Sequence, residues 1–145
     1  MAKKKDETYT IICQVESWDI SYHLFPKEFK LDTFLSDWIE VNARVIFSKS
    51  KNIKEGDDIL FRINIAPIVD YDIECPEYYG SFNKSRKQRE CFISMPNSFA
   101  ERFSLLINQN IKPYFDLSCT TGNYRSIKIK SFSMHSQINI EDYIE

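Results

Sequence analysis

Three carboxylates alternate along the chain at Asp70, Asp72 and Glu74, and an extended strand would place them on one side, about 6–7 Å apart. A hard cation needs several oxygen ligands at once, whereas this spacing offers a two-point contact. Glycoside hydrolysis needs two carboxylates on opposite sides of a bond and in contrasting environments, and these three share one neighbourhood. We therefore interpret the acidic run as a solvated face and predict neither a catalytic residue nor a metal ligand in it.

The residue types that mark most catalytic and metal centres are few and far apart in this chain. The two histidines, His23 and His135, stand near opposite ends of the sequence without a spaced partner, so they do not form a ligand pair. The three glycines, Gly56, Gly80 and Gly122, are too far apart for a phosphate-binding loop. The sequence therefore predicts a non-enzymatic protein with no cofactor and no metal.

The cysteines are also well separated. Cys13, Cys75, Cys91 and Cys119 include no Cys-x-x-Cys pair. Three of them fall on the apolar phase of an expected strand, where a thiol behaves as a small buried hydrophobic group. A disulfide between Cys75 and Cys91 stays open as the alternative, disfavoured because the N-terminus lacks the apolar core of a secretion signal.

The segment from residue 68 to 90 differs in character from the rest of the chain. An acidic run is followed by a turn-forming stretch that carries two tyrosines, and then by a basic run from Lys84 to Arg89. Two compatible interpretations are a protruding hairpin whose arms pair their charges, and a long exposed loop of the kind that carries binding in β-rich folds. The residues predicted to contact a partner are Asp70, Tyr71, Asp72, Tyr78, Tyr79, Phe82, Lys84, Arg86, Lys87 and Arg89.

The leading functional hypothesis is a non-enzymatic module that binds another protein through residues 70–89, as adaptors, regulatory subunits and immunity-type proteins do. An alternative is an oligonucleotide-binding-like barrel for single-stranded nucleic acid, because the cations at 84–89 stand near aromatic residues. The net charge of −2 and the neighbouring carboxylates weaken that alternative. A third hypothesis, a small-ligand carrier or an enzyme that uses the barrel interior, needs polar side chains inside.

Two strict hydrophobic alternations give the clearest structural signal. They are Ile39-Val41-Ala43-Val45-Phe47 and Ile59-Phe61-Ile63-Ile65, separated by a turn-forming run at 51–57. A period of two predicts an antiparallel hairpin, residues 38–48 and 57–66, that is buried on one face. The opposite face carries mixed charge and no aromatic ring, which indicates ordinary solvated surface. Its residues are Glu40, Asn42, Arg44, Arg62 and Asn64.

The rest of the chain supplies further strands and one helix. Alternation predicts a strand at 9–15 that continues through 20–24, and later strands near Ile93, Leu117 and Ile129. Ser98 and Glu101 match a capping box, so an amphipathic helix should begin there and end before the next proline. The apolar phase of the last strand changes after Ile129, which predicts a bulge near residues 130–131.

These elements together predict a mainly β fold, an antiparallel barrel or two-layer sandwich of about seven strands with one amphipathic α-helix at about 98–110. With 145 residues, 43% of them hydrophobic, the chain can form a single domain, 1–145. We expect frayed tails at 1–7 and 141–145, although Ile138 and Ile140 also suggest an edge strand at 137–141. No apolar segment is long enough to span a membrane, so we expect a cytoplasmic protein.

Overall fold

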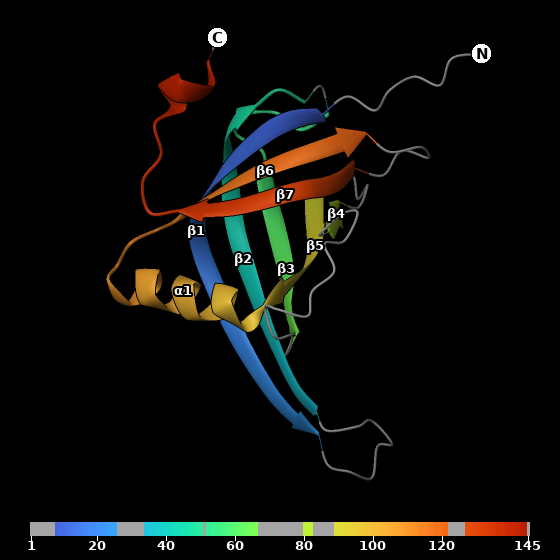
Figure 1. The fold of residues 1–145 in the computed structure, drawn as a ribbon, viewed down its shortest axis with the longest axis vertical. Helices are drawn as coiled ribbons and strands as arrows, with labels where there is room; N and C mark the ends of the chain where they lie inside the picture. The colour runs from blue at the N-terminus through green and yellow to red at the C-terminus, as the bar shows by residue number, and fades with distance from the viewer. Residues whose placement is uncertain are drawn as a thin grey trace, which may run out of the picture.

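The computed structural model describes residues 8–25, 34–50, 52–66, 80–82, 89–121 and 127–144, and the structural statements below concern these residues. Within them, seven strands close into a barrel in the order β1-β2-β3-β5-β4-β7-β6, and β6 pairs back with β1 (Figure 1). The predicted mainly β architecture is confirmed, in its barrel form. The elements are β1 (Thr8–Phe25), β2 (Phe34–Ser48), β3 (Asp58–Ala66), β4 (Gly80–Phe82), β5 (Arg89–Pro96), α1 (Asn97–Asn108), β6 (Tyr114–Thr121), β7 (Ile127–His135) and the 3-10 helix η3 (Ile140–Tyr143).

One strand pairing departs from the antiparallel pattern. β3 and β5 run parallel, with Phe61 opposite Cys91 and Ile63 opposite Ile93. A parallel pair needs a long connection, and residues 67–88 provide it. β4 lies within that connection and pairs antiparallel with both β5 and β7. The sheet is therefore mixed, and part of the unusual 68–90 segment belongs to the barrel wall.

The central hairpin forms where the alternation predicts it. β2 and β3 pair antiparallel, with Val41 opposite Phe61 and Ala43 opposite Ile59. All four side chains are buried in the barrel interior. The period of two therefore identifies the inner face of the hairpin correctly.

A bulge in β2 corrects the end of that alternation. Phe47 pairs with Ile12, but the next pair along the strands is Val45 with Cys13, so Ile46 is an extra residue. Because one extra residue reverses the face on which the following side chains lie, Phe47 points outward while Val45 points into the core. Phe47 is still only 6% exposed, since the C-terminal segment packs on it from outside.

Aromatic rings fill much of the barrel interior. The ring centroid of Phe115 lies 5.2 Å from that of Phe61 and 4.9 Å from that of Phe132. Edge-on and tilted ring pairs at such distances add to the stability of a core, in addition to the stability that comes from burying their apolar area. Among the described residues, no charged residue is buried. The polar interior that a ligand carrier or an enzyme would need is therefore not found in this part of the chain.

Three cysteines line the same interior. Cys13, Cys91 and Cys119 are buried free thiols, as their apolar phase predicts. Burial raises the pKa of the Cys119 thiol to about 12 and holds the pKa of Cys91 well above its ordinary value, so both stay protonated. Because Cys91 is a free thiol, it does not form the disulfide considered with Cys75, which lies outside the described residues.

α1 packs against the barrel through two buried phenylalanines, Phe99 and Phe103. The Phe103 ring meets Trp18 of β1 edge-on, with centroids 6.2 Å apart. The Phe99 ring lies 5.6 Å from that of Phe132 on β7. The helix therefore contacts β1 and β7 through the aromatic core, and its apolar stripe faces the sheet as predicted.

The start of α1 differs from the prediction. The helix begins at Asn97, directly after the extended Pro96, and no side chain caps it. The predicted capping box is therefore wrong, because Ser98 already lies within the helix, whereas a capping residue has non-helical backbone. At the other end, Asn110 adopts a left-handed conformation with φ of 59°, and the helix stops before Pro113 as expected.

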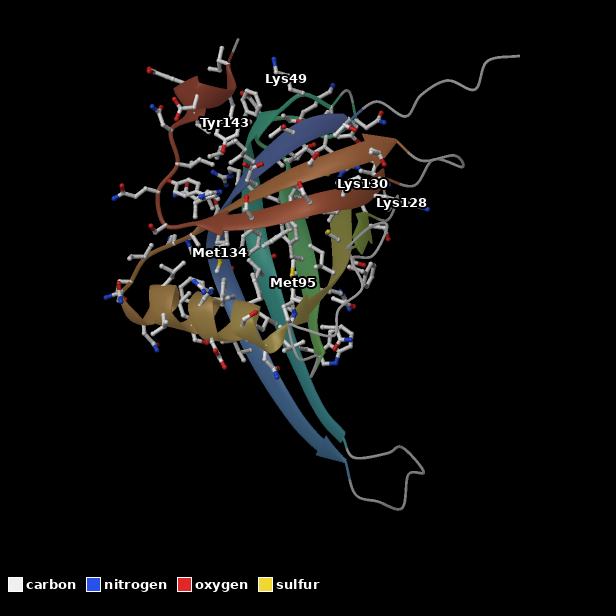
Figure 2. All side chains as sticks on the ribbon, viewed as in Figure 1. Lys49, Met95, Lys128, Lys130, Met134 and Tyr143 are labelled. Carbon is white, nitrogen blue, oxygen red and sulfur yellow. The ribbon has the colours of Figure 1, made fainter. Side chains whose placement is uncertain are left out.

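The last strand contains the predicted bulge. Ser118 of β6 pairs with Ser131, but the next residue, Cys119, pairs with Ile129, so Lys130 is the extra residue. The extra residue explains why the apolar phase changes along β7. It also leaves Lys130 exposed on the outside of the barrel (Figure 2).

The C-terminal residues fold back over the outside of the barrel. The Tyr143 hydroxyl of η3 donates to the Asp116 carboxylate at 2.8 Å, and its ring centroid lies 6.1 Å from that of Phe47. Residues 137–141 do not form the suggested edge strand, since β6 and β7 already have a strand on each side. Within the predicted tail 141–145, Tyr143 is therefore held against the barrel.

Candidate functional site

Most residues predicted to bind a partner lie outside the described part of the chain. This group comprises Asp70, Tyr71, Asp72, Tyr78, Tyr79, Lys84, Arg86 and Lys87. Two members of the predicted set, Phe82 and Arg89, are described, and both belong to the barrel wall.

Phe82 is a core residue. It is 3% exposed, lies opposite Cys91 and Ile127, and has its ring centroid 6.4 Å from that of Phe61. The prediction that Phe82 contacts a partner is therefore wrong. Its neighbours in the sequence are polar and charged, yet the short strand β4 turns its side chain into the barrel.

Arg89 lies at the start of β5 and is half-buried. Its Nη2 donates to the Asn52 carbonyl oxygen at 2.9 Å, which ties β5 to the turn between β2 and β3. A charge-assisted hydrogen bond of this kind is stronger than a neutral one. Arg89 therefore has a structural contact in addition to any role in binding.

One described residue of the 68–90 segment lines a groove on the outer face of the barrel. Gly80, which follows residues 67–79 in the chain, is part of the lining. The groove has a volume of about 300 Å³ and is lined by four adjacent strands. The lining residues are Trp38 of β2, Arg62 and Asn64 of β3, Phe92, Ile93 and Ser94 of β5, and Gly80 of β4. We refer to this feature as the outer groove.

The strand register brings these residues to one face. Asn64 stands opposite Trp38 on β2 and opposite Ser94 on β5. Arg62 stands opposite Phe92, because β3 and β5 are parallel neighbours. Directly paired residues point to the same side of a sheet. The outward-facing side chains of three strands therefore meet at the outer groove.

Gly80 lets β4 approach β5 closely at one side of the outer groove. A Cβ atom at this position would meet the Phe92 carbonyl oxygen and lie 2.8 Å from Cγ1 of Ile93. A larger residue would force β4 away from β5. The glycine is therefore required by this close approach rather than by a turn.

Two aromatic residues of the outer groove are open to solvent. Trp38 is 38% exposed and Phe92 is 42% exposed. The other large hydrophobic residues that are exposed in the described chain, such as Leu105, are aliphatic. Tryptophan and arginine carry much of the binding energy in protein interfaces, and Arg62 stands directly opposite Phe92.

Arg62 is the charged residue of the lining. Its Nη2 lies 3.2 Å from Oε1 of Glu90, and Glu40 stands opposite it on β2. Its Nε is buried without an acceptor among the described residues. The outer groove thus combines two exposed rings, a guanidinium that is already paired with a carboxylate, and a buried donor that a bound acceptor would satisfy.

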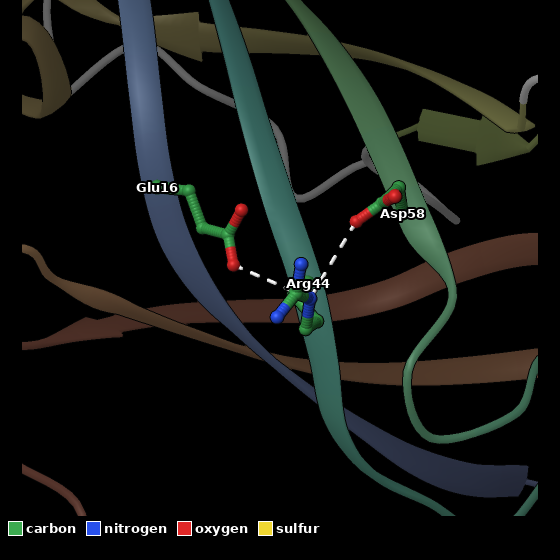
Figure 3. A network of polar contacts seen from close by, with 3 residues as sticks. All are labelled: Glu16, Arg44 and Asp58. Carbon is green, nitrogen blue, oxygen red and sulfur yellow. Dashed lines mark ion pairs between the residues drawn. The ribbon is translucent and has the colours of Figure 1, made fainter.

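A second polar cluster lies on the outward face of the first three strands. Nε of Arg44 lies 3.3 Å from Oε1 of Glu16 and 3.7 Å from Oδ1 of Asp58 (Figure 3). All three side chains are exposed, so each ion pair contributes at most about 1 kcal/mol. This part of the face agrees with its interpretation as solvated surface.

The sequence interpretation missed the outer groove for a specific reason. Trp38 shares the outward phase of Glu40, but it stands before the first residue of the alternation, Ile39, and so falls outside the polar set that begins at Glu40. Phe92 lies between the buried Cys91 and Ile93, so the alternation already assigns it to the outside. The two rings share one face only because β3 and β5 are parallel neighbours, which the sequence did not predict.

The described residues hold no group of three or more histidine, cysteine, aspartate or glutamate side chains that could bind a metal ion. None of the described helices combines the length and the apolarity that crossing a membrane requires. Comparison of the chain with protein-family models, with curated proteins and with solved structures finds no match.

Proposed function

We propose that this protein is a non-enzymatic binding module that holds another protein at the outer groove. The observation that carries the proposal is the exposure of two aromatic residues, Trp38 and Phe92, in a groove that also contains Arg62. Aromatic residues and arginine are enriched in protein interfaces. The partner would place an apolar side chain against the rings and a hydrogen-bond acceptor near Nε of Arg62.

Charge favours a protein over a nucleic acid at this groove. A phosphate backbone is bound chiefly by lysine and arginine side chains that neutralise it. Arg62 is instead 3.2 Å from Glu90, and Glu40 stands opposite it. Exposed apolar surface with paired charges suits the centre of a protein interface, where charged residues are depleted.

The charged and aromatic residues of segment 70–89 extend the proposal. Gly80 belongs to the lining of the outer groove, and Tyr79 is its neighbour in the chain. We infer that Tyr78 and Tyr79, together with the acidic residues from Asp70 onward, contact the same partner. Loops anchored on a rigid sheet commonly supply such contacts.

Cross-linked co-purification from the native host tests the proposal. Tagged wild type would be compared with Phe92→Ser in the outer groove and with Leu105→Ser on α1, which removes exposed apolar surface outside it. We expect one protein to be recovered equally with wild type and Leu105→Ser, and about tenfold less with Phe92→Ser. Equal recovery with all three proteins would contradict binding at the outer groove.

A second candidate partner is single-stranded nucleic acid, which one feature of the register favours. Phe92 pairs with Ser81 of β4, and Ser81 pairs with Lys128 of β7, so an exposed ring and a lysine belong to one outward row. Lys130 is exposed on the same strand (Figure 2). Aromatic rings beside cations are typical of proteins that bind single strands.

Fluorescence anisotropy with labelled oligonucleotides separates the two candidates. Nucleic-acid binding should weaken with added salt and on replacing Lys84, Arg86, Lys87 and Arg89 together with glutamate. No binding of oligonucleotide by wild type at low salt would remove this candidate, and equal binding by wild type and the quadruple variant would exclude the basic run at 84–89 as its site. Either result would leave the protein-binding proposal unaffected.

A further inference from the structure

β1 is longer than barrel closure requires. β6 pairs with one edge of β1 only from Thr8 to Gln14, and the Val15 amide then donates to the Pro113 carbonyl oxygen at 2.9 Å. β2 pairs with the other edge as far as Phe25. From residue 17 to residue 25, therefore, one edge of β1 has no strand partner within the described ranges.

This part of β1 and the first residues of β2 form an arm that leaves the barrel. A bulge at Glu16 marks the point of departure, because Val15 pairs with Ala43 and Ser17 with Asn42. Figure 1 shows the ends of these two strands projecting beyond the rest of the barrel. A two-stranded ribbon is marginally stable in water, so the arm would gain stability from a third strand.

The free edge contains neither lysine nor proline, two residues by which edge strands often avoid pairing. Its sequence is Ser17-Trp18-Asp19-Ile20-Ser21-Tyr22-His23-Leu24-Phe25. Ile20 is 48% exposed, although Ile39 opposite it on β2 is buried. A long edge with an apolar alternation and no lysine or proline is a template for another strand.

We propose that the strand that pairs with this edge is β1 of a second copy of the chain, antiparallel about a two-fold axis at Ser21. This register pairs every residue from 17 to 25 of one copy with a residue of the other. Asp19 faces His23 of the second copy, and Ile20 faces Tyr22 of the second copy. Trp18 pairs with Leu24 of the second copy, and Ser17 pairs with Phe25 at each end. Every pair except this outermost one joins two polar or two apolar residues, so the centre of the strand is complementary to itself.

Length and charge select this register over its neighbours. An axis at residue 20 or 22 leaves part of the free edge unpaired and places Asp19 opposite Ser21 or Phe25. An axis between two residues pairs the apolar face of one strand with the polar face of the other. Ser21 stands opposite Trp38 of the outer groove, but the pairing uses the other edge of β1 and needs no second protein. Each proposal can therefore fail without the other.

Disulfide trapping tests the register. Directly opposed residues of antiparallel strands have Cα atoms about 4.5–5.5 Å apart, within the range that a disulfide spans. With Cys75 replaced by serine, Ser21→Cys should give a covalent dimer on a non-reducing gel after mild oxidation. Asp19→Cys is the matched control, because residue 19 of the two copies would lie about 13 Å apart. The double variant Asp19→Cys, His23→Cys should restore the dimer.

Absence of trapping at position 21, or equal trapping at positions 19 and 21, would overturn the proposed pairing. Sedimentation velocity over a range of concentrations supplies the second measurement. Wild type should form dimers as the concentration rises, and Ser21→Lys, which sets two lysines opposite each other at the axis, should weaken dimerisation at least about fivefold. Phe92→Ser should not change it.

A wild-type protein that stays monomeric at the highest concentration would also overturn the proposal. Far-ultraviolet circular dichroism of Ser21→Lys controls for folding, because residue 21 lies in a strand that β2 holds on its other edge. A folded Ser21→Lys variant that dimerises as well as wild type would be equally decisive against the two-fold at Ser21.

Discussion

Two apolar patches lie on the outside of the barrel, and only one of them is covered by another segment of the chain. At the first, Phe47 stands opposite Ile12, and both are buried although they point away from the core. Tyr143 of the C-terminal segment packs on the Phe47 ring and donates a hydrogen bond to Asp116. The second patch is the outer groove, whose aromatic rings remain open to solvent.

The comparison distinguishes the Phe47 patch, whose burial stabilises the fold, from the outer groove, whose exposed rings contribute little to folding. Covering Phe47 removes apolar area from water, which stabilises the barrel by roughly 25 cal/mol per Å² and offsets the entropy lost in ordering the C-terminal segment. Trp38 and Phe92 gain much less from folding, because each keeps a large exposed fraction. A binding partner explains two uncovered rings better than stability does.

The largest expected effect concerns the covered patch. Phe47→Ala should lower the free energy of unfolding by about 3 kcal/mol, because it removes a buried ring between the barrel and Tyr143. Urea denaturation measures this loss, and Leu105→Ala on the exposed face of α1 is the matched control. A loss no larger than that of Leu105→Ala would show that the packing of Tyr143 on Phe47 contributes nothing to stability.

Phe47 also shows how much of the fold can be predicted from the sequence. The alternation up to Val45 identifies the inner face because side-chain direction in a strand depends on local period alone. The bulge at Ile46 is a property of the pairing between β1 and β2, so the hydrophobic pattern within β2 does not predict it. The bulge at Lys130 was predictable, since the apolar phase changes within the strand itself.

The candidate site was less predictable for a related reason. Phe82 and Phe92 both stand in the segment near the basic run, but β4 buries the first and β5 exposes the second. Which of two nearby rings faces outward depends on where each short strand begins. The outer groove then depends on the parallel pairing of β3 with β5, a contact between distant parts of the chain.

A smaller effect concerns the hydrogen bond from the Tyr143 hydroxyl to Asp116, which holds the C-terminal segment on the barrel. The pKa of the Tyr143 hydroxyl is raised above its ordinary value of 10.0, first because the neutral phenol donates to Asp116, and further by burial and the nearby carboxylates. A raised folded-state pKa means that the stabilisation is fully present below pH 10.0 and is lost as the pH rises through the higher value.

Tyr143→Phe should therefore cost about 0.5–1 kcal/mol near neutral pH and nothing in strongly alkaline solution. Thermal melts of both proteins across this pH range measure the difference. Tyr9, whose pKa is also raised by burial, ionises in both proteins and cancels in the comparison. If the difference in stability between wild type and Tyr143→Phe is constant from neutral to strongly alkaline pH, the hydrogen bond does not hold the C-terminal segment on the barrel.

The smallest effect is expected in the outer groove, and it decides whether the two patches really differ. Phe92→Ser should change the free energy of unfolding by no more than about 0.5 kcal/mol, because Phe92 lies on the outer surface and is 42% exposed, outside the buried core. Phe47→Ser, measured by the same urea titration, should destabilise far more. If the two serine variants lose similar stability, the outer groove is part of the folding surface, and its exposed rings no longer argue for a partner.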